Sequence, residues 1–273
     1  MVKKMKIGIA LGSGGAKGLA HIGVMEILQK YGIQVDIIAG TSMGAIIGGL
    51  IALGYKPAEL EVRANMQGAE SKNELMKRSI NSRALYSTEY IHSRLFKMYG
   101  DKIFSDLKIP FYALATDLIK GEKVVFNSGK LINAVEASSR IPLYYPPKKI
   151  GKMVLVDGAV TCPVPTGVLK GKCDFIISVP LPSYNKNIHP HHSLKMMNTL
   201  DRSIDILMDK LMKTELNCEQ PNLVINMDGI EKYSTFDFDY TKEIIEIGRN
   251  STEKVIKELL GKLNKMKFNK NNY

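Results

Sequence analysis

The five residues Gly40 to Gly44 place a serine in a pattern that is typical of nucleophilic catalysis. They read Gly-Thr-Ser-Met-Gly and fit Gly-x-Ser-x-Gly, the nucleophile elbow, which is a sharp turn between a strand and a helix. The apolar run 33–39 precedes the turn and the Gly/Ala/Ile-rich run 45–53 follows it. Glycines flank the serine because side chains would clash at so tight a corner. The motif predicts that Ser42 is a nucleophile beside a helix N-terminus that favours negative charge.

A serine hydroxyl needs a base to remove its proton, and the sequence offers two kinds of base. Asp157 follows the short apolar run 153–156, and Gly158 permits a tight turn directly after it. A partly desolvated carboxylate within reach of a serine can act as the general base, although Asp-Gly is also an ordinary turn. The alternative is a Ser-His-Asp triad with a base from the loop 189–192. That loop contains His189, His191 and His192.

A glycine-rich loop, residues 12–18, is a natural source of backbone N–H groups that stabilise an oxyanion. It follows the apolar run 6–11 and precedes a helical pattern, so we expect it at the same sheet edge as Ser42. The loop misses Gly-x-Gly-x-x-Gly, which argues against dinucleotide binding. Three roles are open for Lys17: it orients this loop, it contacts a lipid phosphate, or it is an ordinary surface charge. For His21 the open roles are a place near the site and a packing or capping role in the helix.

The elements that position these residues alternate between strands and helices. Apolar runs predict strands at residues 6–11, 33–39, 110–116, 123–127, 153–156 and 174–179. Helical spacing marks residues 19–31, 45–53 and 130–139. The polar segment 56–106 has helical stretches but no strong strand, and we expect it to cap the site. The alternation predicts a mostly parallel sheet with helices on both faces.

Two amphipathic helices are predicted in the last third of the chain. One apolar stripe consists of Met197, Leu200, Ile204, Leu207 and Leu211. The other consists of Ile256, Leu259, Leu260 and Leu263. We expect both stripes to face the core rather than a membrane. One more strand is predicted within residues 222–227.

Composition narrows the class of protein. The chain has 273 residues, 45% of them hydrophobic, and a formal net charge of +11. This length fits one large α/β domain. The excess of lysine is typical of a solubilising surface and also suits an anionic membrane surface or acidic substrates. It suits nucleic acid least, because no basic motif is interleaved with aromatic residues. Three cysteines without metal-ligand spacing fit a reducing compartment, so we expect a cytoplasmic protein. The uncharged run 37–55 could span a bilayer, but the elbow and its glycines indicate a buried strand and helix.

Five separate motifs, in the same order, resemble the patatin-like phospholipases, which are lipid acyl hydrolases with a Ser-Asp dyad. The motifs lie at residues 11–24, 40–44, 115–121, 137–142 and 157–159. The resemblance covers residues 6–165. It implies a patatin-like catalytic core over 6–165, with residues 166–273 as an extension of a strand and helices on the same domain. Ser13 departs from the pattern, because the family often has glycine there.

The resemblance implies a three-layer α/β/α sandwich with a mostly parallel central sheet, and ester hydrolysis through an acyl-enzyme. Ser42 would attack the ester carbonyl and Asp157 would take its proton, without a metal or cofactor. The residues of the oxyanion hole would be Ser13, Gly14 and Gly15. The supporting residues would be Lys17, Gly18, Gly40, Gly44 and Gly158.

The implied partner is a lipid or other acyl ester substrate, with peripheral contact to an anionic membrane surface and no nucleic acid. A second class of function stays open. The same fold could serve as a non-catalytic lipid- or protein-binding module if a closed cap silenced the dyad.

Overall fold

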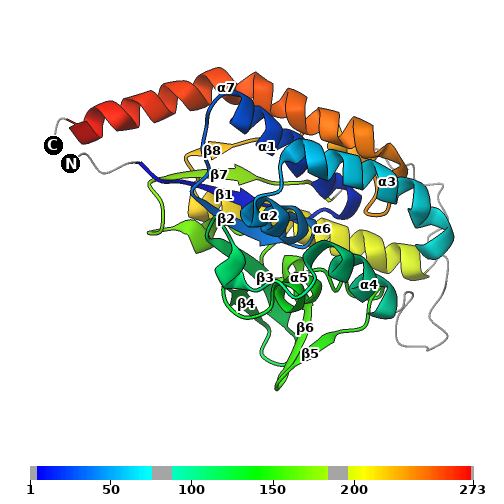
Figure 1. Ribbon diagram of the computed structural model, residues 1–273. Helices are drawn as coiled ribbons and strands as arrows, with labels where there is room; N and C mark the ends of the chain where they lie inside the picture. The colour runs from blue at the N-terminus through cyan, green and yellow to red at the C-terminus, as the bar shows by residue number, and fades with distance from the viewer. Residues whose placement is uncertain (1–4, 76–87, 184–195, 272–273) are drawn as a thin grey trace.

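The computed structural model describes residues 5–75, 88–183 and 196–271, and shows a central sheet between layers of helices (Figure 1). Within these ranges the sheet has eight strands. They are β1 (Ile7–Leu11), β2 (Ile37–Thr41), β3 (Phe111–Asp117), β4 (Glu122–Phe126), β5 (Lys148–Ile150), β6 (Met153–Asp157), β7 (Phe175–Val179) and β8 (Leu223–Val224). The helices are α1 (Ala20–Lys30), α2 (Met43–Leu53), α3 (Pro57–Leu75), α4 (Thr88–Tyr99), α5 (Leu131–Ser138), α6 (Met196–Glu219) and α7 (Thr241–Asn271).

The larger part of the sheet is parallel, which confirms the predicted fold class. Its strands follow the order β3-β2-β1-β7-β8, and each neighbouring pair is parallel. The other pairs, β3–β4, β3–β6 and β5–β6, are antiparallel. Short turns join β3 to β4 and β5 to β6, and a short turn can join only antiparallel strands. The sheet is therefore mixed, with an antiparallel margin beside β3.

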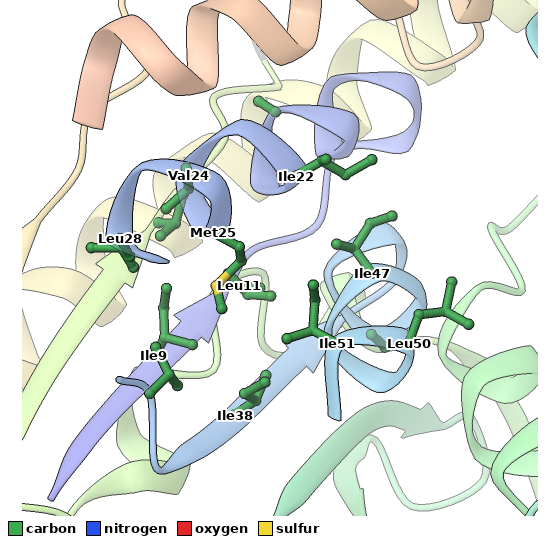
Figure 2. Packing of buried hydrophobic residues seen from close by; sticks show 14 of the residues in the cluster. Ile9, Leu11, Ile22, Val24, Met25, Leu28, Ile38, Ile47, Leu50 and Ile51 are labelled. Atoms are coloured by element: carbon green, nitrogen blue, oxygen red, sulfur yellow. The ribbon is translucent and has the colours of Figure 1, made fainter. Parts of the chain in front are cut away.

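Alternate residues of β1 explain how helices come to cover both faces of the sheet. Ile9 and Leu11 point to one face, where Figure 2 shows them packed with side chains of α1 and α2. Ala10 points to the opposite face and packs in a smaller cluster with Val164 and Met212, the latter on α6. Burial on both faces is expected of parallel strands in a three-layer fold.

The long helix α7 packs along α1, where glycine permits close contact (Figure 1). A Cβ on Gly248 of α7 would collide with the backbone oxygen of Ala20. A Cβ on Gly23 of α1 would collide with the backbone oxygen of Ile245. The predicted core-facing stripe on α7 is confirmed, since Leu259 and its neighbours in the stripe are buried or half-buried.

The other predicted stripe is confirmed only in part. On α6, Leu200 and Leu207 are 43% and 68% exposed, whereas Ile204 and Leu211 are half-buried and Met212, next to Leu211, is buried. Met212 and Leu216, in the second half of the helix, pack in the cluster that contains Ala10 of β1, so the helix covers the sheet there. Met197 lies outside the residues whose side chains the structure describes.

Several element boundaries differ from the predictions. The second strand begins at Ile37 rather than at residue 33, and the predicted strand at 222–227 is reduced to β8. The three-residue strand β5 was missed because its sequence, Lys-Lys-Ile, has little apolar signal. The glycine-rich loop 12–18 closes into a 3-10 helix, Gly15–Leu19. The domain boundary at residue 165 stays a prediction, and β7 and β8 beyond it join the same sheet.

The uncharged run 37–55 is the buried strand β2 followed by helix α2, as predicted. In the described part of the chain, no helix is both long and apolar enough to cross a membrane. The run places the nucleophile elbow at the carboxyl end of a parallel strand, where sites of α/β proteins form.

Candidate active site

Ser42 lies at the turn between β2 and α2 in a strained backbone conformation, with φ of 56° and ψ of −123°. Positive φ is unfavourable for a residue with a side chain and marks a constrained turn. The two predicted glycines are required by close backbone contact. A Cβ on Gly40 would collide with the main chain of Gly44, and a Cβ on Gly44 would collide with the backbone oxygen of Leu11. The corner is therefore built from residues without side chains around one serine.

Asp157 and Ser42 lie in direct contact although 115 positions separate them in the sequence. The Ser42 Oγ donates a hydrogen bond of 2.6 Å to Asp157 Oδ2, and both residues are buried. The other carboxylate oxygen accepts the Ala159 N–H at 2.9 Å. Burial raises the pKa of Asp157 to about 7, against the hydrogen bonds from Ser42 and Ala159, which lower it. This carboxyl can therefore take up a proton near neutral pH.

The strand β6 carries Asp157 to this position by pairing with β3, where Asp157 lies opposite Ala115. The backbone oxygen of Asp157 accepts a hydrogen bond of 3.0 Å from Thr116 Oγ1. Gly158 is needed because a Cβ there would collide with the backbone oxygen of Leu114. Thr41 Oγ1 donates to the Cys162 oxygen at 2.9 Å and ties the elbow to the turn after Asp157.

The glycine-rich loop lies beside Ser42, but its three predicted oxyanion residues are not equivalent. The Ser13 N–H donates to the Pro163 oxygen at 2.8 Å, so this amide is already engaged. The N–H groups of Gly14 and Gly15 have no acceptor in the described part of the chain. Gly15 has φ of 55°, and a Cβ there would collide with the Thr235 backbone. Of the three predicted amides, that of Ser13 is therefore already bonded within the described residues, and the oxyanion role of the other two stays a prediction.

His21 is fully buried behind this loop, with no bond to Ser42. Its Nε2 lies 2.8 Å from the Gly12 oxygen, and burial lowers the pKa of the imidazole to about 4. The neutral ring therefore donates from Nε2, which fixes the start of the loop. Of the two open roles for His21, the packing role fits.

Lys17 is not a surface charge, because only 2% of it is exposed. Its Nζ donates to the backbone oxygens of Pro182 at 2.9 Å and Ser183 at 3.4 Å. Burial lowers the pKa of Lys17, against Asp205 and other carboxylates that raise it. Gly18 lets the same helical turn approach α2, since a Cβ there would collide with the Met43 side chain. Lys17 thus joins the glycine loop to the segment after β7.

Two cavities meet at Ser42. The first, of about 150 Å³, is apolar and follows one face of α2, with α3 and α4 as its far wall. The main apolar side chains that line it are Met43, Ile46, Ile47, Leu50, Leu60, Ala64, Ile91, Leu95 and Met98. From Met43 to Leu50 this face extends about 10 Å along the helix axis. Two helices of the polar segment 56–106 therefore line the apolar cavity, and its role as a cap stays a prediction.

The second cavity, of about 320 Å³, is lined by several charged side chains as well as by Asp157, Gly14 and Gly15, and is called the polar cavity below. Its charged lining residues include Lys17, Asp201, Arg202, Asp205, Glu231 and Lys232. Burial raises the pKa of Asp205 to about 6. None of these residues except Lys17 was predicted, because most lie on α6 and the segment 231–236, where no local motif marks a site.

The histidines of the alternative triad, His189, His191 and His192, lie outside the described residues. Within the described residues, no group of three or more His, Cys, Asp or Glu side chains is arranged to hold a metal ion.

Residues 9–170, more than half of the chain, match the profile of a family described as patatin-like phospholipase. The chain belongs to the patatin-like phospholipase family. This patatin-like chain is 33% identical to a Mycobacterium bovis protein described as an uncharacterized NTE family protein, over 75% of this chain and 58% of that protein. Its identity to lysophospholipase NTE1 of Meyerozyma guilliermondii is 24%, over 89% of this chain and 18% of that protein.

The patatin-like chain thus spans from about a fifth to under two thirds of the length of these relatives. Among solved structures, human GIVD cytosolic phospholipase A2 has a TM-score of 0.52 at 12% identity, covering 95% of this chain and 60% of that one. At so low an identity the likeness concerns the fold alone.

Proposed function

We propose that this protein hydrolyses the ester bond of a lipid that carries an acyl chain, through a Ser42–Asp157 dyad. The observation that carries the proposal is the 2.6 Å hydrogen bond between the two side chains at the junction of an apolar and a polar cavity. The relative named lysophospholipase and the family itself support lipid ester hydrolysis.

The reaction begins when Ser42 Oγ attacks the ester carbonyl and passes its proton to Asp157. The negative charge that develops on the carbonyl oxygen is held by the N–H groups of Gly14 and Gly15. Collapse of this intermediate breaks the ester bond, and Asp157 returns the proton to the leaving alcohol. The products of this step are a free alcohol and an acyl group bound to Ser42.

A water molecule then attacks the acyl-enzyme, and Asp157 takes its proton. The second collapse releases the carboxylic acid and returns a proton to Ser42 Oγ. With a pKa of about 7, Asp157 is strong enough as a base and yet largely ionised just above neutral pH. The pKa of Asp157 is raised by burial, which makes this carboxylate more basic than one in water.

The two cavities orient the substrate. The acyl chain lies in the apolar cavity along α2, and the alcohol part lies in the polar cavity beside Lys17 and Asp205. The polar cavity carries both signs of charge, which suits a zwitterionic head group. Because one apolar cavity adjoins Ser42 in the described residues, a substrate with a single acyl chain fits better than a diacyl lipid.

The test is a panel of lysophospholipids, diacyl phospholipids and simple esters, assayed with the wild-type protein and Ser42→Ala. We expect single-chain lipids to be hydrolysed fastest, with no release of fatty acid by the variant. Equal release by both proteins would overturn the proposal. A triple variant that replaces His189, His191 and His192 by Ala separates the dyad from the triad, because the dyad predicts full activity.

Contact with an anionic membrane surface and a cytoplasmic location remain predictions from the sequence.

A further inference from the structure

One short segment, residues 138–140 at the end of α5, bonds to both halves of the dyad. The Ser138 Oγ accepts the Ser42 backbone N–H at 2.8 Å. The Arg140 backbone oxygen accepts the Asp157 N–H at 2.9 Å. Nucleophile and base are therefore held by the same three residues, although each comes from a different strand of the sheet.

The segment is itself fixed by a buried ion pair. Arg140 and Glu136 are each 1% exposed, and the guanidinium of Arg140 bonds to the carboxylate of Glu136 one helical turn earlier. Glu136 also accepts a 2.9 Å bond from Lys148 Nζ and lies 3.1 Å from His92 Nδ1. Burial alone would raise the pKa of Glu136, but the hydrogen bonds from Lys148 and His92 and the charge of Arg140 outweigh it and lower the pKa. A buried ion pair of this kind resists rearrangement, since removing one partner leaves an unpaired charge.

The Ser42 amide needs such a partner because of its place in the chain. Ser42 precedes the first residue of α2, so its N–H has no acceptor within the helix. Its positive φ is a strained conformation that persists only where the surroundings hold it. Ser138 is fully buried, and its hydroxyl is the group that accepts this N–H.

We propose that Ser138 is a positioning residue, whose hydroxyl holds the Ser42 backbone in the conformation that places Oγ on Asp157. The inference rests on the proposed function of the dyad. It assigns to Ser138 no contact with substrate, because the hydroxyl acts through the Ser42 amide. A small displacement of the nucleophile lowers the rate of attack steeply, whereas binding of the acyl chain in its cavity is untouched.

The experiment compares Ser138→Ala with Ser178→Ala, the same substitution at an equally buried serine of β7. Ser178 bonds to Thr166 at 2.8 Å and lines neither cavity, so it reports the general cost of losing a buried hydroxyl. Each variant is assayed for kcat, for KM, for thermal stability and for the rate at which a fluorophosphonate labels Ser42. We expect Ser138→Ala to lower kcat and the labelling rate about tenfold or more, with KM within about twofold of wild type. Ser178→Ala should keep both rates.

Unchanged rates in Ser138→Ala, or equal losses in the two variants, would overturn the positioning role. If Ser138→Ala does not fold, Ser138→Cys keeps the volume and replaces the oxygen with a weak acceptor, and the same loss of labelling rate is expected. Failure of the proposed function would look different. It would appear as wild-type hydrolysis equal to that of Ser42→Ala, whereas the labelling rate reports on Ser42 whichever ester is the substrate.

Discussion

Replacing Asp157 by Asn should abolish hydrolysis and stabilise the fold in a pH-dependent manner. The fold keeps Asp157 largely protonated below a pKa of about 7, whereas the unfolded chain releases the proton near 3.8. As the pH rises between these values, the unfolded state loses its proton first and the free energy of unfolding falls. Asn is neutral at every pH and has nearly the same shape as Asp, so the variant should not lose stability as the pH rises.

The magnitude follows from the size of the shift. A pKa raised from 3.8 to about 7 corresponds to about 4 kcal/mol of unfolding free energy, since one unit is about 1.4 kcal/mol. About half of this free energy is lost above about pH 5.5. From about pH 5.5 to about pH 8.5, the stability of Asp157→Asn relative to wild type should therefore increase by roughly 2 kcal/mol. Over the same range, kcat/KM of the wild type should rise with an apparent pKa of about 7.

The assay is urea unfolding of wild type, Asp157→Asn and Ser42→Ala at both pH values. Ser42→Ala is the control, because it is inactive but keeps the buried carboxyl. Its stability should still fall as the pH rises, with the fall extending to higher pH, since the hydrogen bond from Ser42 that lowers the pKa of Asp157 is lost. A stability difference between Asp157→Asn and wild type that stays constant across this range would refute the reasoning. Hydrolysis by Asp157→Asn at the wild-type rate would refute it as well.

Two further predictions concern the elbow and the apolar cavity. Gly44→Ala should lower the thermal midpoint and the activity together, because its Cβ would collide with the Leu11 oxygen. Its control is Gly261→Ala in α7, which has open space around it and should raise stability by about 0.5–1 kcal/mol in a melting experiment. Ala64→Phe should reduce turnover of long-chain esters while short-chain esters are still cleaved, because Ala64 lines the far wall of the acyl cavity. Val62→Phe, on the same helix but exposed, should leave the chain-length profile unchanged.

Local sequence rules were sufficient to predict the elbow. The glycines around Ser42 are required by backbone contacts within a few residues and with the adjacent strand, and such contacts leave a short motif. The parallel part of the sheet was predictable for a similar reason, since buried strands read as apolar runs. The role of Asp157 was ambiguous from its own residues, because an Asp-Gly turn looks the same whether or not a serine lies opposite.

What could not be predicted depends on contacts between distant residues. The Ser13 amide looked like an oxyanion donor until folding placed the Pro163 oxygen against it. Three roles were open for Lys17 from the sequence, and only folding shows that it is buried against two carbonyl groups. The stripe on α6 has the helical period of a core helix, but the period does not say how much of the helix the rest of the fold covers. Ser138 matched a family motif without any signal for its bond to Ser42.

The most direct test of the dyad is site-mapped labelling by a fluorophosphonate, read by intact-protein mass and peptide sequencing. We expect one covalent adduct, on Ser42, that is absent in Ser42→Ala and forms far more slowly in Asp157→Asn. Labelling of Ser42 at the wild-type rate in Asp157→Asn, or an adduct on another serine, would contradict the proposed dyad.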